Sequence, residues 1–387
     1  MTSVSHEVER TVLERYSQGA KARVAELCCP VDYDPHYLEV IPEEVIRRDY
    51  GCGDPSRHVR AGETVLDLGS GSGKICYIAS QIVGPEGHVI GVDMNQDMLN
   101  LARDYQAEVT GRIGWNNVEF RRARIQDLEL DLDAVGEWLA DHPVHTPDDL
   151  VSLEAEQDRL RREQPLVADQ SVDVVVSNCV LNLVEEEEKS RLFAALFRVL
   201  KRGGRAVISD IVSDEPVPQH LKADPELWSD CVSGAMTEQG FLAAFEQAGF
   251  YGVEILSRSE RPWRTLEGIE FRSVTVRAYR GKEGPCVETN KALIYKGPWK
   301  EVVDDDAHVF RRGERAAVCE KTFRIMTGEP YAGSFEPVLP LVPVDPDQQR
   351  PFDCSRTQPR SPRESKGLDY DITTEASAPT CSDDSCC

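Results

Sequence analysis

Short apolar runs alternate with helix-length segments through the middle of the chain. Residues 65–68, 88–93 and 172–176 are dominated by Val, Ile and Leu, as strands buried on both faces of a parallel sheet are. Residues 74–83 and 96–109 lie between such runs and have the length and polarity pattern of helices. Strands that alternate with helices in this way predict an α/β fold, a Rossmann-like sheet with helices on both faces.

The same alternation continues as far as residue 281. We expect a polar insertion at 131–165, rich in Asp and Glu, to form a surface helix or loop. The run of glutamates that begins at Glu185 favours a helix start, because the helix dipole attracts negative charge there. The further predicted elements are strands in 117–128 and 205–212, a strand with its exit in 172–184, helices in 185–204 and 237–250, and a closing hairpin from 253–260 and 271–280.

The character of the chain changes at three points, which divide it into four parts. Residues 1–60 are helical and irregular and contain three cysteines, and residues 61–281 carry the alternating pattern. Residues 282–336 show short alternating runs, which predict a small β-rich domain. Residues 337–387 are rich in Pro, Asp, Ser and Thr and end in a cysteine cluster, so we expect a disordered tail there.

Charge and cysteine content narrow the function classes. The net charge of −24 over 387 residues repels phosphate backbones and anionic lipid, so nucleic acid and membranes are not expected partners. The N-terminus has no apolar secretory core, which favours the cytoplasm, where thiols stay reduced. In that compartment the 12 cysteines are expected to be ligands, redox centres or small core residues.

The stretch VLDLGSGSG joins the end of a predicted strand to a glycine-rich turn. Gly69, Gly71 and Gly73 let the backbone approach a ligand closely, because they carry no Cβ atom. Asp93 follows Gly73 by twenty residues and is placed to accept hydrogen bonds from ribose hydroxyls. The G-x-G-x-G spacing departs from the dinucleotide fingerprint. The turn therefore predicts a different nucleoside-containing cofactor, and a structural βαβ unit without a ligand is the alternative.

Cysteines stand at several predicted strand exits and loops. Asn178 and Cys179 directly follow the fourth strand, at the sheet edge where open α/β sheets bind ligands. Cys231 lies in the segment after the fifth strand. Cys52 is flanked by glycines, which suggests exposed and adaptable backbone. None of these cysteines has C-x-x-C zinc spacing, and lone cysteines at strand exits are often only small core residues.

Four motifs taken together resemble the arsenite methyltransferases: YGCG at 50–53, VLDLGSGSG at 65–73, SNCVLNLV at 177–184 and WSDCVSGA at 228–235. The resemblance implies the class I methyltransferase fold and S-adenosyl-L-methionine as cofactor. It also implies that Cys52, Cys179 and Cys231 hold As(III) as thiolates. Together with the glycine turn, the cofactor-binding residues are then expected to be Tyr50, Asp67, Gly69, Gly71, Gly73, Asp93, Met94, Ile125 and Asn178.

The resemblance carries further expectations about the reaction. Arsenite and methylarsenite would be the substrates, mono- and dimethylated arsenicals the products, and detoxification of arsenic the purpose. In this family an N-terminal cysteine pairs reversibly with the YGCG cysteine, so Cys28 or Cys29 would pair with Cys52. The sequence has two adjacent cysteines where one is usual, which leaves the partner open. A reducing thiol, thioredoxin or glutathione, would act as co-substrate, and we expect a monomer.

The chemistry of the residues agrees with this resemblance. As(III) is thiophilic, and three sulfur ligands leave its lone pair free to attack an electron-poor methyl group. The nucleophile carries no proton, so no general base is needed. Two rival functions stay open. A methyltransferase for another small molecule would leave the three cysteines unexplained, and a non-enzymatic metal-binding or zinc protein would leave the glycine turn and Asp93 unexplained.

Overall fold

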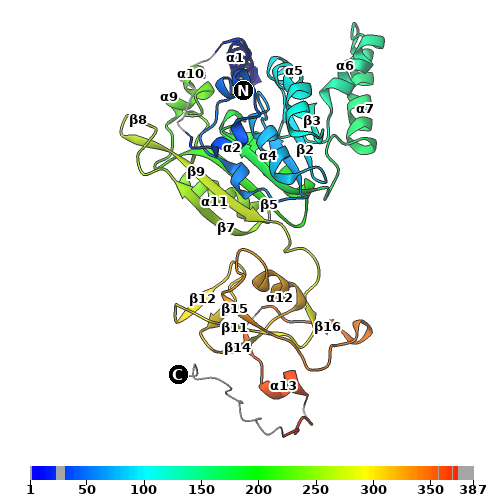
Figure 1. The fold of residues 1–387 in the computed structure, drawn as a ribbon, viewed down its shortest axis with the longest axis vertical. Helices are drawn as coiled ribbons and strands as arrows, with labels where there is room; N and C mark the ends of the chain where they lie inside the picture. The colour runs from blue at the N-terminus through cyan, green and yellow to red at the C-terminus, as the bar shows by residue number, and fades with distance from the viewer. Residues whose placement is uncertain (1, 23–30, 356, 368, 374–387) are drawn as a thin grey trace. The chain divides into compact units, whose positions relative to one another are not determined.

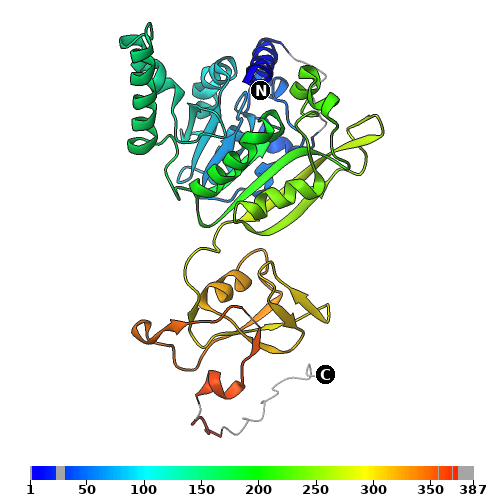
Figure 2. The same ribbon diagram turned by 180° about the vertical axis from the view of Figure 1, so that it is seen from behind.

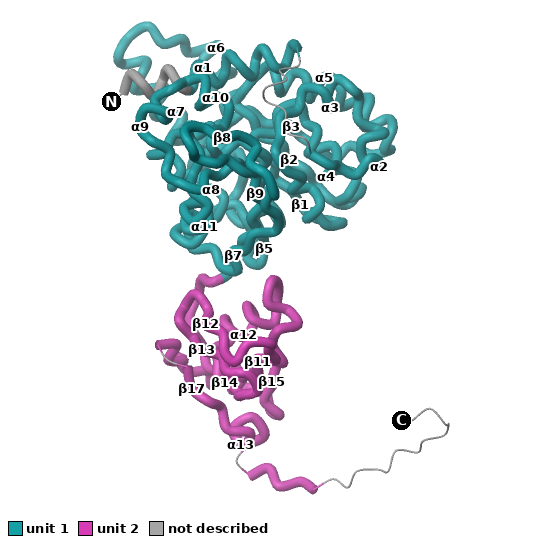
Figure 3. The backbone as a smooth tube through the Cα atoms, turned by 90° about the vertical axis from the view of Figure 1, so that its left-hand side faces the viewer, with its two compact units in different colours: residues 1–281 teal, residues 282–387 magenta. Residues whose placement is uncertain are grey.

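The computed structural model describes the chain except for residues 1, 23–30, 356, 368 and 374–387. Cys28, Cys29 and the three terminal cysteines lie outside the described residues. The chain divides into two compact units, residues 1–281 and residues 282–387, which Figure 3 colours separately. No helix in the described part of the chain combines the length and the apolar character that a membrane span requires.

The first unit is built on a nine-stranded sheet whose central path runs β3-β2-β1-β4-β5-β9-β7. The five strands from β3 to β5 are parallel, and β9 is antiparallel to both of its neighbours, as a closing hairpin requires. β1 has β2 on one side and β4 on the other, so the strand order reverses there. The strands are β1 (Thr64–Leu68), β2 (His88–Asp93), β3 (Val118–Arg122), β4 (Val172–Asn178), β5 (Leu200–Ser213), β6 (Met236–Thr237), β7 (Tyr251–Arg258), β8 (Arg264–Leu266) and β9 (Ile269–Tyr279).

Alternate residues of each central strand enter two different cores. Val65 of β1 packs with α4 and α5, whereas Leu66 and Leu68 pack with α8 and α11 on the opposite face. The predicted helices on both faces of the sheet are therefore confirmed (Figures 1 and 2). The main helices of the unit are α1 (Thr2–Lys21), α4 (Lys74–Val83), α5 (Gln96–Ile113), α6 (Leu132–Asp141), α7 (Pro147–Glu163), α8 (Lys189–Val199) and α11 (Glu238–Gln247).

The N-terminal segment is an integral part of this first unit. α1 lies along α10 and α5, and the Arg15 guanidinium forms an ion pair with Asp230 at 2.5 Å. Asn95 donates from its amide to the Leu13 carbonyl at 3.1 Å, which ties α1 to the end of β2. The shorter helices are α2 (Pro35–Leu38), α3 (Glu43–Arg47), η2 (Pro55–His58), η3 (Leu181–Leu183), η4 (Glu186–Glu188), α9 (Gln219–Lys222) and α10 (Pro225–Ser229).

Two sequence expectations change in this unit. The insertion forms a pair of helices, α6 and α7, capped by Asp131 and by a Thr146 capping box, and held by a small apolar cluster around Leu160. The helix predicted for 185–204 is wrong in its ends. α8 spans Lys189–Val199, and β5 already begins at Leu200, because Gly203 pairs by its N–H with the Arg280 carbonyl at 2.7 Å.

The second unit has a four-stranded antiparallel sheet in the order β15-β11-β14-β17, beside two short strand pairs. Its only described helix longer than five residues, α12, is capped by the sulfur of Cys319. The elements are β10 (Val287–Glu288), β11 (Ala292–Tyr295), β12 (Glu301–Val303), β13 (Val309–Arg311), β14 (Arg315–Ala317), α12 (Glu320–Thr327), β15 (Phe335–Val338), η5 (Pro346–Gln348), β16 (Arg350–Pro351), β17 (Gln358–Pro359) and α13 (Pro362–Lys366).

The expectation of a disordered tail from residue 337 is wrong for its first thirty or so residues. β16 pairs with β10 and β17 pairs with β14, so this stretch supplies two strands to the second unit. Arg360 is only 7% exposed and binds both carboxylate oxygens of Glu288 at 2.8 Å. Most prolines of this stretch stand in edge strands or at helix starts, where proline is tolerated.

Two truncations test whether this stretch belongs to the fold. A chain that stops after Val338 loses β16, β17 and Arg360, so we expect the second unit to lose its cooperative unfolding transition. A chain that stops after Thr373 keeps all of them and should unfold as the full chain does. Calorimetry of both proteins is the measurement. If the two truncated chains unfold alike, the expectation of a disordered tail from residue 337 would stand.

Candidate functional site

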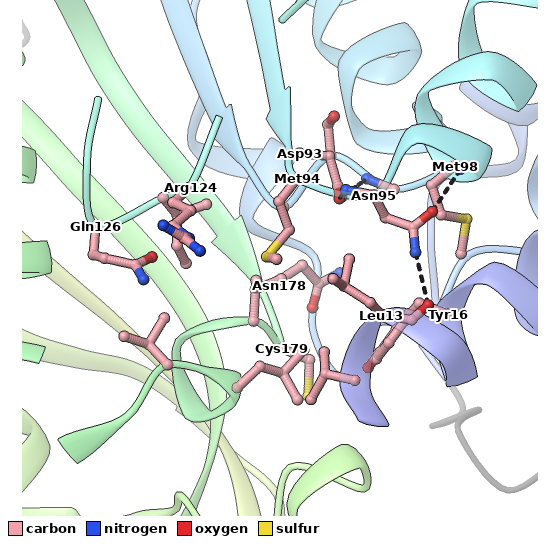
Figure 4. Close-up of a pocket in the computed structure, with 18 of the residues that line it drawn as sticks. Leu13, Tyr16, Asp93, Met94, Asn95, Met98, Arg124, Gln126, Asn178 and Cys179 are labelled. Carbon is pink, nitrogen blue, oxygen red and sulfur yellow. Dashed lines mark hydrogen bonds between the residues drawn. The ribbon is translucent and has the colours of Figure 1, made fainter. Parts of the chain in front are cut away.

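A cavity of about 410 Å³ opens where the carboxyl ends of β1, β2 and β4 meet (Figure 4). Val12 and Tyr16 of α1 line the same cavity, so α1 closes one side of it. Eight of the nine predicted cofactor residues line it: Tyr50, Asp67, Gly69, Gly71, Asp93, Met94, Ile125 and Asn178.

The glycine turn is shaped for close approach of a ligand. Gly69 has φ +67°, and a Cβ atom there would lie 2.5 Å from the Val180 side chain. The turn is locked from the next strand, because Gly71 donates its N–H to Asp93 Oδ2 at 2.9 Å. Gly73 is not among the lining residues. With φ +86°, it stands at the start of α4, where a Cβ would come within 2.8 Å of Phe120.

Two aspartates face this cavity from neighbouring strands. Asp93 also accepts from the Asn95 N–H at 2.8 Å, so its carboxylate joins the turn after β1 to the turn after β2. Burial raises the pKa of Asp93, although these backbone hydrogen bonds oppose the rise. Asp67 is 2% exposed and accepts from the Cys76 thiol at 3.2 Å, and burial raises its pKa to about 8. Asp67 is thus largely protonated at neutral pH in the free protein.

Two buried polar atoms on the lining have neither a hydrogen-bond partner nor an ion-pair partner within the described chain. They are Ser70 Oγ, in the glycine turn, and Asp127 Oδ1, after β3. The other oxygen of Asp127 takes ion pairs from Arg161 at 3.1 Å and Arg191 at 3.2 Å. Because buried polar groups are nearly always paired, these atoms point to a polar ligand in the cavity. Arg161 belongs to α7, so the insertion does touch the site, although none of the motifs lies in it.

Three buried cysteines meet next to the cavity. Cys179 follows β4 and lines the cavity, and its thiol interacts with the thiols of Cys52 and Cys231, although the three sulfur atoms do not all lie within 4.8 Å of one another. All three are between 5% and 7% exposed and belong to one apolar cluster. Cys179 and Cys231 have φ of +64° and +61°, a left-handed conformation that residues other than glycine rarely adopt. Such strain, held in place at a cavity wall, is typical of functional sites.

Specific anchors hold the two strained cysteines. Cys179 donates its N–H to the Ser209 carbonyl at 2.7 Å, and Cys231 donates its thiol to the Cys179 carbonyl at 3.3 Å. The Asn182 amide donates to the Cys231 carbonyl at 3.2 Å and to the Ile211 carbonyl at 2.6 Å. Gly234 lies so close to Asn182 that a Cβ would approach its carbonyl oxygen to 1.9 Å. The W-x-x-C-x-x-G-A motif is therefore packed directly against the loop after β4.

Asn178 lines the cavity and also fixes the loop that carries Cys52. Its Oδ1 accepts from the N–H groups of Cys52 and Gly53 at 2.9 and 3.0 Å. Its Nδ2 donates to the Gly53 carbonyl at 2.7 Å and to the Tyr33 hydroxyl at 3.0 Å. The amide is thus fully used in fixing the loop that carries Cys52. The expectation that this cysteine is exposed and adaptable is wrong, because it is buried and clamped.

The environment favours the protonated form of the Cys52 and Cys179 thiols. Burial raises the pKa of Cys52. Hydrogen bonds with Cys231 and Cys52, and then burial, raise the pKa of Cys179 well above its usual value. Desolvation also raises the pKa of Asp210 to about 6, even though its carboxylate accepts from Ile211 N–H and Leu181 N–H at 2.8 Å. Neutral thiols in an apolar cluster suit a ligand that binds sulfur covalently.

Sequence reasoning missed the part of the site that α1 supplies. Tyr16 lies next to the Cys231 thiol, and burial raises the pKa of its hydroxyl well above the usual value. Arg15 binds Asp230 and Ser229, the two residues before Cys231. The available signal was the helical spacing of Val12, Tyr16 and Ala20, which marks an apolar helix face that has to be covered. All three residues pack in small apolar clusters against the rest of the first unit.

Two protein families match this chain, one in each of its two units. A methyltransferase domain matches residues 60–152 and 152–249, and a domain of unknown function matches residues 282–370.

Several curated proteins described as arsenite methyltransferase are similar to this chain. The protein from Aquipseudomonas alcaligenes is 30% identical over 352 residues, which cover 86% of this chain and 90% of that protein. The mouse protein is 29% identical, with 86% of this chain and 79% of that protein covered. The Halobacterium salinarum protein is 41% identical over 54% of this chain, a match that spans only 43% of that relative's length.

One solved structure aligns over most of the chain. It is an arsenic(III) S-adenosylmethionine methyltransferase from Chlamydomonas reinhardtii, 25% identical, with a TM-score of 0.54. The alignment covers 84% of this chain and all of that one.

The clamp on the Cys52 loop generates a prediction. Asn178→Ala leaves two buried N–H groups unpaired, at about 1–3 kcal/mol each, so the Cys52 loop should open far more often. We expect alkylation of Cys52 by iodoacetamide, followed by peptide mass spectrometry, to be at least about tenfold faster. Asn182→Ala is the matched control, and it should speed alkylation of Cys231 and spare Cys52. Unchanged Cys52 reactivity in Asn178→Ala would contradict the assigned role.

Proposed function

The chain belongs to the arsenite methyltransferases, and we propose that Cys52, Cys179 and Cys231 hold As(III) at the end of the cofactor cavity for methylation. The activity is the S-adenosylmethionine-dependent methylation of arsenite. The observation that carries the proposal is the meeting of three buried thiols at Cys179, which is itself part of the cavity wall.

The residues of the cavity fit the cofactor. The partner-free Asp127 Oδ1 can accept from the exocyclic amino group of an adenine, and Asp93 can accept from ribose hydroxyls. Asp67 can meet the amino group of the methionine part, whose positive charge would favour its ionised form. Bound S-adenosylmethionine supplies an electrophilic methyl group, whose transfer to the arsenic lone pair leaves S-adenosylhomocysteine and formally oxidises the arsenic.

The three thiols can take up arsenite without a general base. Each neutral thiol exchanges with one hydroxyl of arsenous acid, so an As–S bond and a water molecule form while an As–OH and an S–H bond are lost. The raised pKa values of Cys52 and Cys179 suit this exchange, because it releases no proton. Three sulfur ligands leave one open position on arsenic, its lone pair. The clamped loops then hold that lone pair in one orientation, and positioning alone can lower a barrier by several kcal/mol.

The oxidation state of arsenic requires a reductant. We propose that Cys28 or Cys29 pairs with Cys52 in a disulfide during turnover, and that thioredoxin or glutathione in a reducing cytoplasm restores both thiols. The thiol of Cys28 or Cys29 attacks the arsenic-bound sulfur of Cys52, so an S–S bond forms while the Cys52–As bond breaks. The electron pair of that bond stays on arsenic, which returns to As(III), and the thiol proton is released to solvent. Replacing Cys28 and Cys29 together by Ser should stop turnover when external reductant is limiting, measured as methylated arsenic per enzyme. Full multiple turnover in that double variant would refute the pairing.

The direct test of the function is an assay with purified protein, arsenite, S-adenosylmethionine and a thiol, with products separated by methyl count. We expect mono- and dimethylated arsenicals. Methyl transfer only to another small molecule would favour the first rival. A protein that binds thiophilic ions but no cofactor would favour the second.

The cofactor assignment predicts the effect of two changes at Asp93. Asp93→Ala removes an acceptor for ribose and also releases Gly71, so binding of S-adenosylmethionine should weaken by about 1–3 kcal/mol. Asp93→Asn keeps one acceptor oxygen and should lose less. Calorimetric titration measures both affinities. The assignment fails if the alanine variant binds the cofactor as the parent protein does.

The three cysteines should differ in how each affects the two methylation steps. Arsenite has three exchangeable positions, whereas methylarsenite has only two. Cys179 lies between the other thiols and faces the cavity, so Cys179→Ser should abolish both steps. Cys231→Ser should do the same. Cys52→Ser should lose the first methylation and retain much of the second, since two thiols remain.

Serine is nearly isosteric with cysteine but is a hard ligand, so these losses report ligation. Product analysis from arsenite and from methylarsenite with each variant is the measurement. Activity of Cys179→Ser on either substrate, or failure of Cys52→Ser on both, would show that two thiols are not the common requirement.

A further inference from the structure

The second unit contains another group of three cysteines that the methyl-transfer site does not use. The sulfur atoms of Cys286, Cys319 and Cys354 all lie within 4.8 Å of one another, and all three are free thiols. They are far apart in the sequence, before β10, at the start of α12 and after β16. Cys319 is fully buried, and the other two are partly exposed, so the group can be reached from solvent.

The backbone around each of the three thiols is fixed by a hydrogen bond. Phe352 donates its N–H to the Cys286 carbonyl at 2.9 Å. His308 Nε2 donates to the Cys354 carbonyl at 3.0 Å, while its Nδ1 is 2.8 Å from Asp304. Cys319 caps α12, where its sulfur accepts from the Thr322 N–H at 3.3 Å. The three sulfur atoms are thus brought together by a scaffold and not by a chance meeting of loose side chains.

The number of ligands selects the ion. Structural zinc sites take four protein ligands in a tetrahedron, and no fourth His, Cys, Asp or Glu joins this group within the described residues. His308 is not a candidate, because both of its ring nitrogens are engaged. A three-coordinate thiophilic ion needs only the three sulfur atoms, and As(III) is of this kind.

We propose that Cys286, Cys319 and Cys354 form a second thiol site, which binds As(III) independently of the methyl-transfer site. The choice of As(III) among thiophilic ions rests on the proposed function, whereas the three-sulfur site itself does not. Binding is an exchange without redox change. Arsenous acid loses three hydroxyls as water, three S–H bonds are lost, and three As–S bonds form. The unit that matches a domain of unknown function thereby becomes an arsenic-binding module.

The experiment uses the full chain, in which most of the other cysteines are replaced so that they cannot bind arsenic. Cys28, Cys29, Cys52, Cys179, Cys231, Cys381, Cys386 and Cys387 are all replaced by Ser, which leaves Cys76 and the three cysteines of the second unit. We expect this protein to bind one As(III) per chain, and X-ray absorption at the arsenic edge to report three sulfur neighbours. Adding Cys319→Ser should weaken arsenite binding at least tenfold. Adding Cys76→Ser instead is the matched control and should leave arsenite binding unchanged.

Three outcomes would overturn the proposal. They are the absence of bound arsenic, a spectrum with fewer than three sulfur neighbours, and tight binding of one Zn²⁺ that excess arsenite does not displace. If the eight-serine background does not fold, judged by circular dichroism, the opposite variant decides. Replacing only Cys286, Cys319 and Cys354 by Ser should then remove one bound As(III) from the parent protein's total, and an unchanged total would refute the site.

The same pair of proteins separates this site from the proposed function. Arsenic bound by the eight-serine protein, together with a parent protein that does not methylate arsenite, would leave the second site standing and remove only the proposed catalytic role of the first.

Discussion

The structure of the first unit depends on one constraint, which is that three sulfur atoms from distant segments must meet beside a cofactor cavity. The carboxyl end of β4 provides the meeting point, and Cys179 turns toward it in a left-handed conformation that costs about 1–3 kcal/mol for such a residue. That cost is offset by the backbone bond to Ser209 and by the contacts of Asn182 with the Cys231 loop. The anchoring contacts therefore hold Cys179 and Cys231 in a strained conformation. They also explain why the segment Ser177–Cys179 and the Cys231 loop pack against each other.

The surrounding elements serve the same constraint from different directions. Asn178 extends the end of β4 across to the N-terminal loop and clamps Cys52. α1 brings Tyr16 to Cys231 and, through Asn95, is tied to the strand end that carries Asp93. Asp93 in turn holds the glycine turn. α1 thus lies against both the cysteine group and the strand end that holds the glycine turn.

Sequence patterns were sufficient for the sheet and for most of the site. Apolar runs and glycine turns are local signals, and they located β1, β2, β4, α4 and the lining residues Gly69, Gly71, Asp93 and Asn178. The family resemblance added the other predicted lining residues, Tyr50, Asp67, Met94 and Ile125. The sequence did not reveal the roles of side chains whose partners lie far away along the chain. The direction of the Asn178 amide, the burial of Cys52 and the α1 contacts follow from tertiary packing. The strands β16 and β17 were hidden because isolated edge strands rich in proline have the composition of disorder, and only their pairing with β10 and β14 reveals them.

The central claim is that arsenic bound to the thiols of the first unit faces the cofactor cavity. The most direct measurement is an anomalous difference map at the arsenic edge, from crystals of the full chain grown with arsenite and S-adenosylhomocysteine. The account predicts an arsenic peak bonded to Cys52, Cys179 and Cys231, with its open side toward the sulfur of the cofactor product. An arsenic peak remote from Cys179, or one at Cys179 whose open side faces away from the cavity, would contradict it.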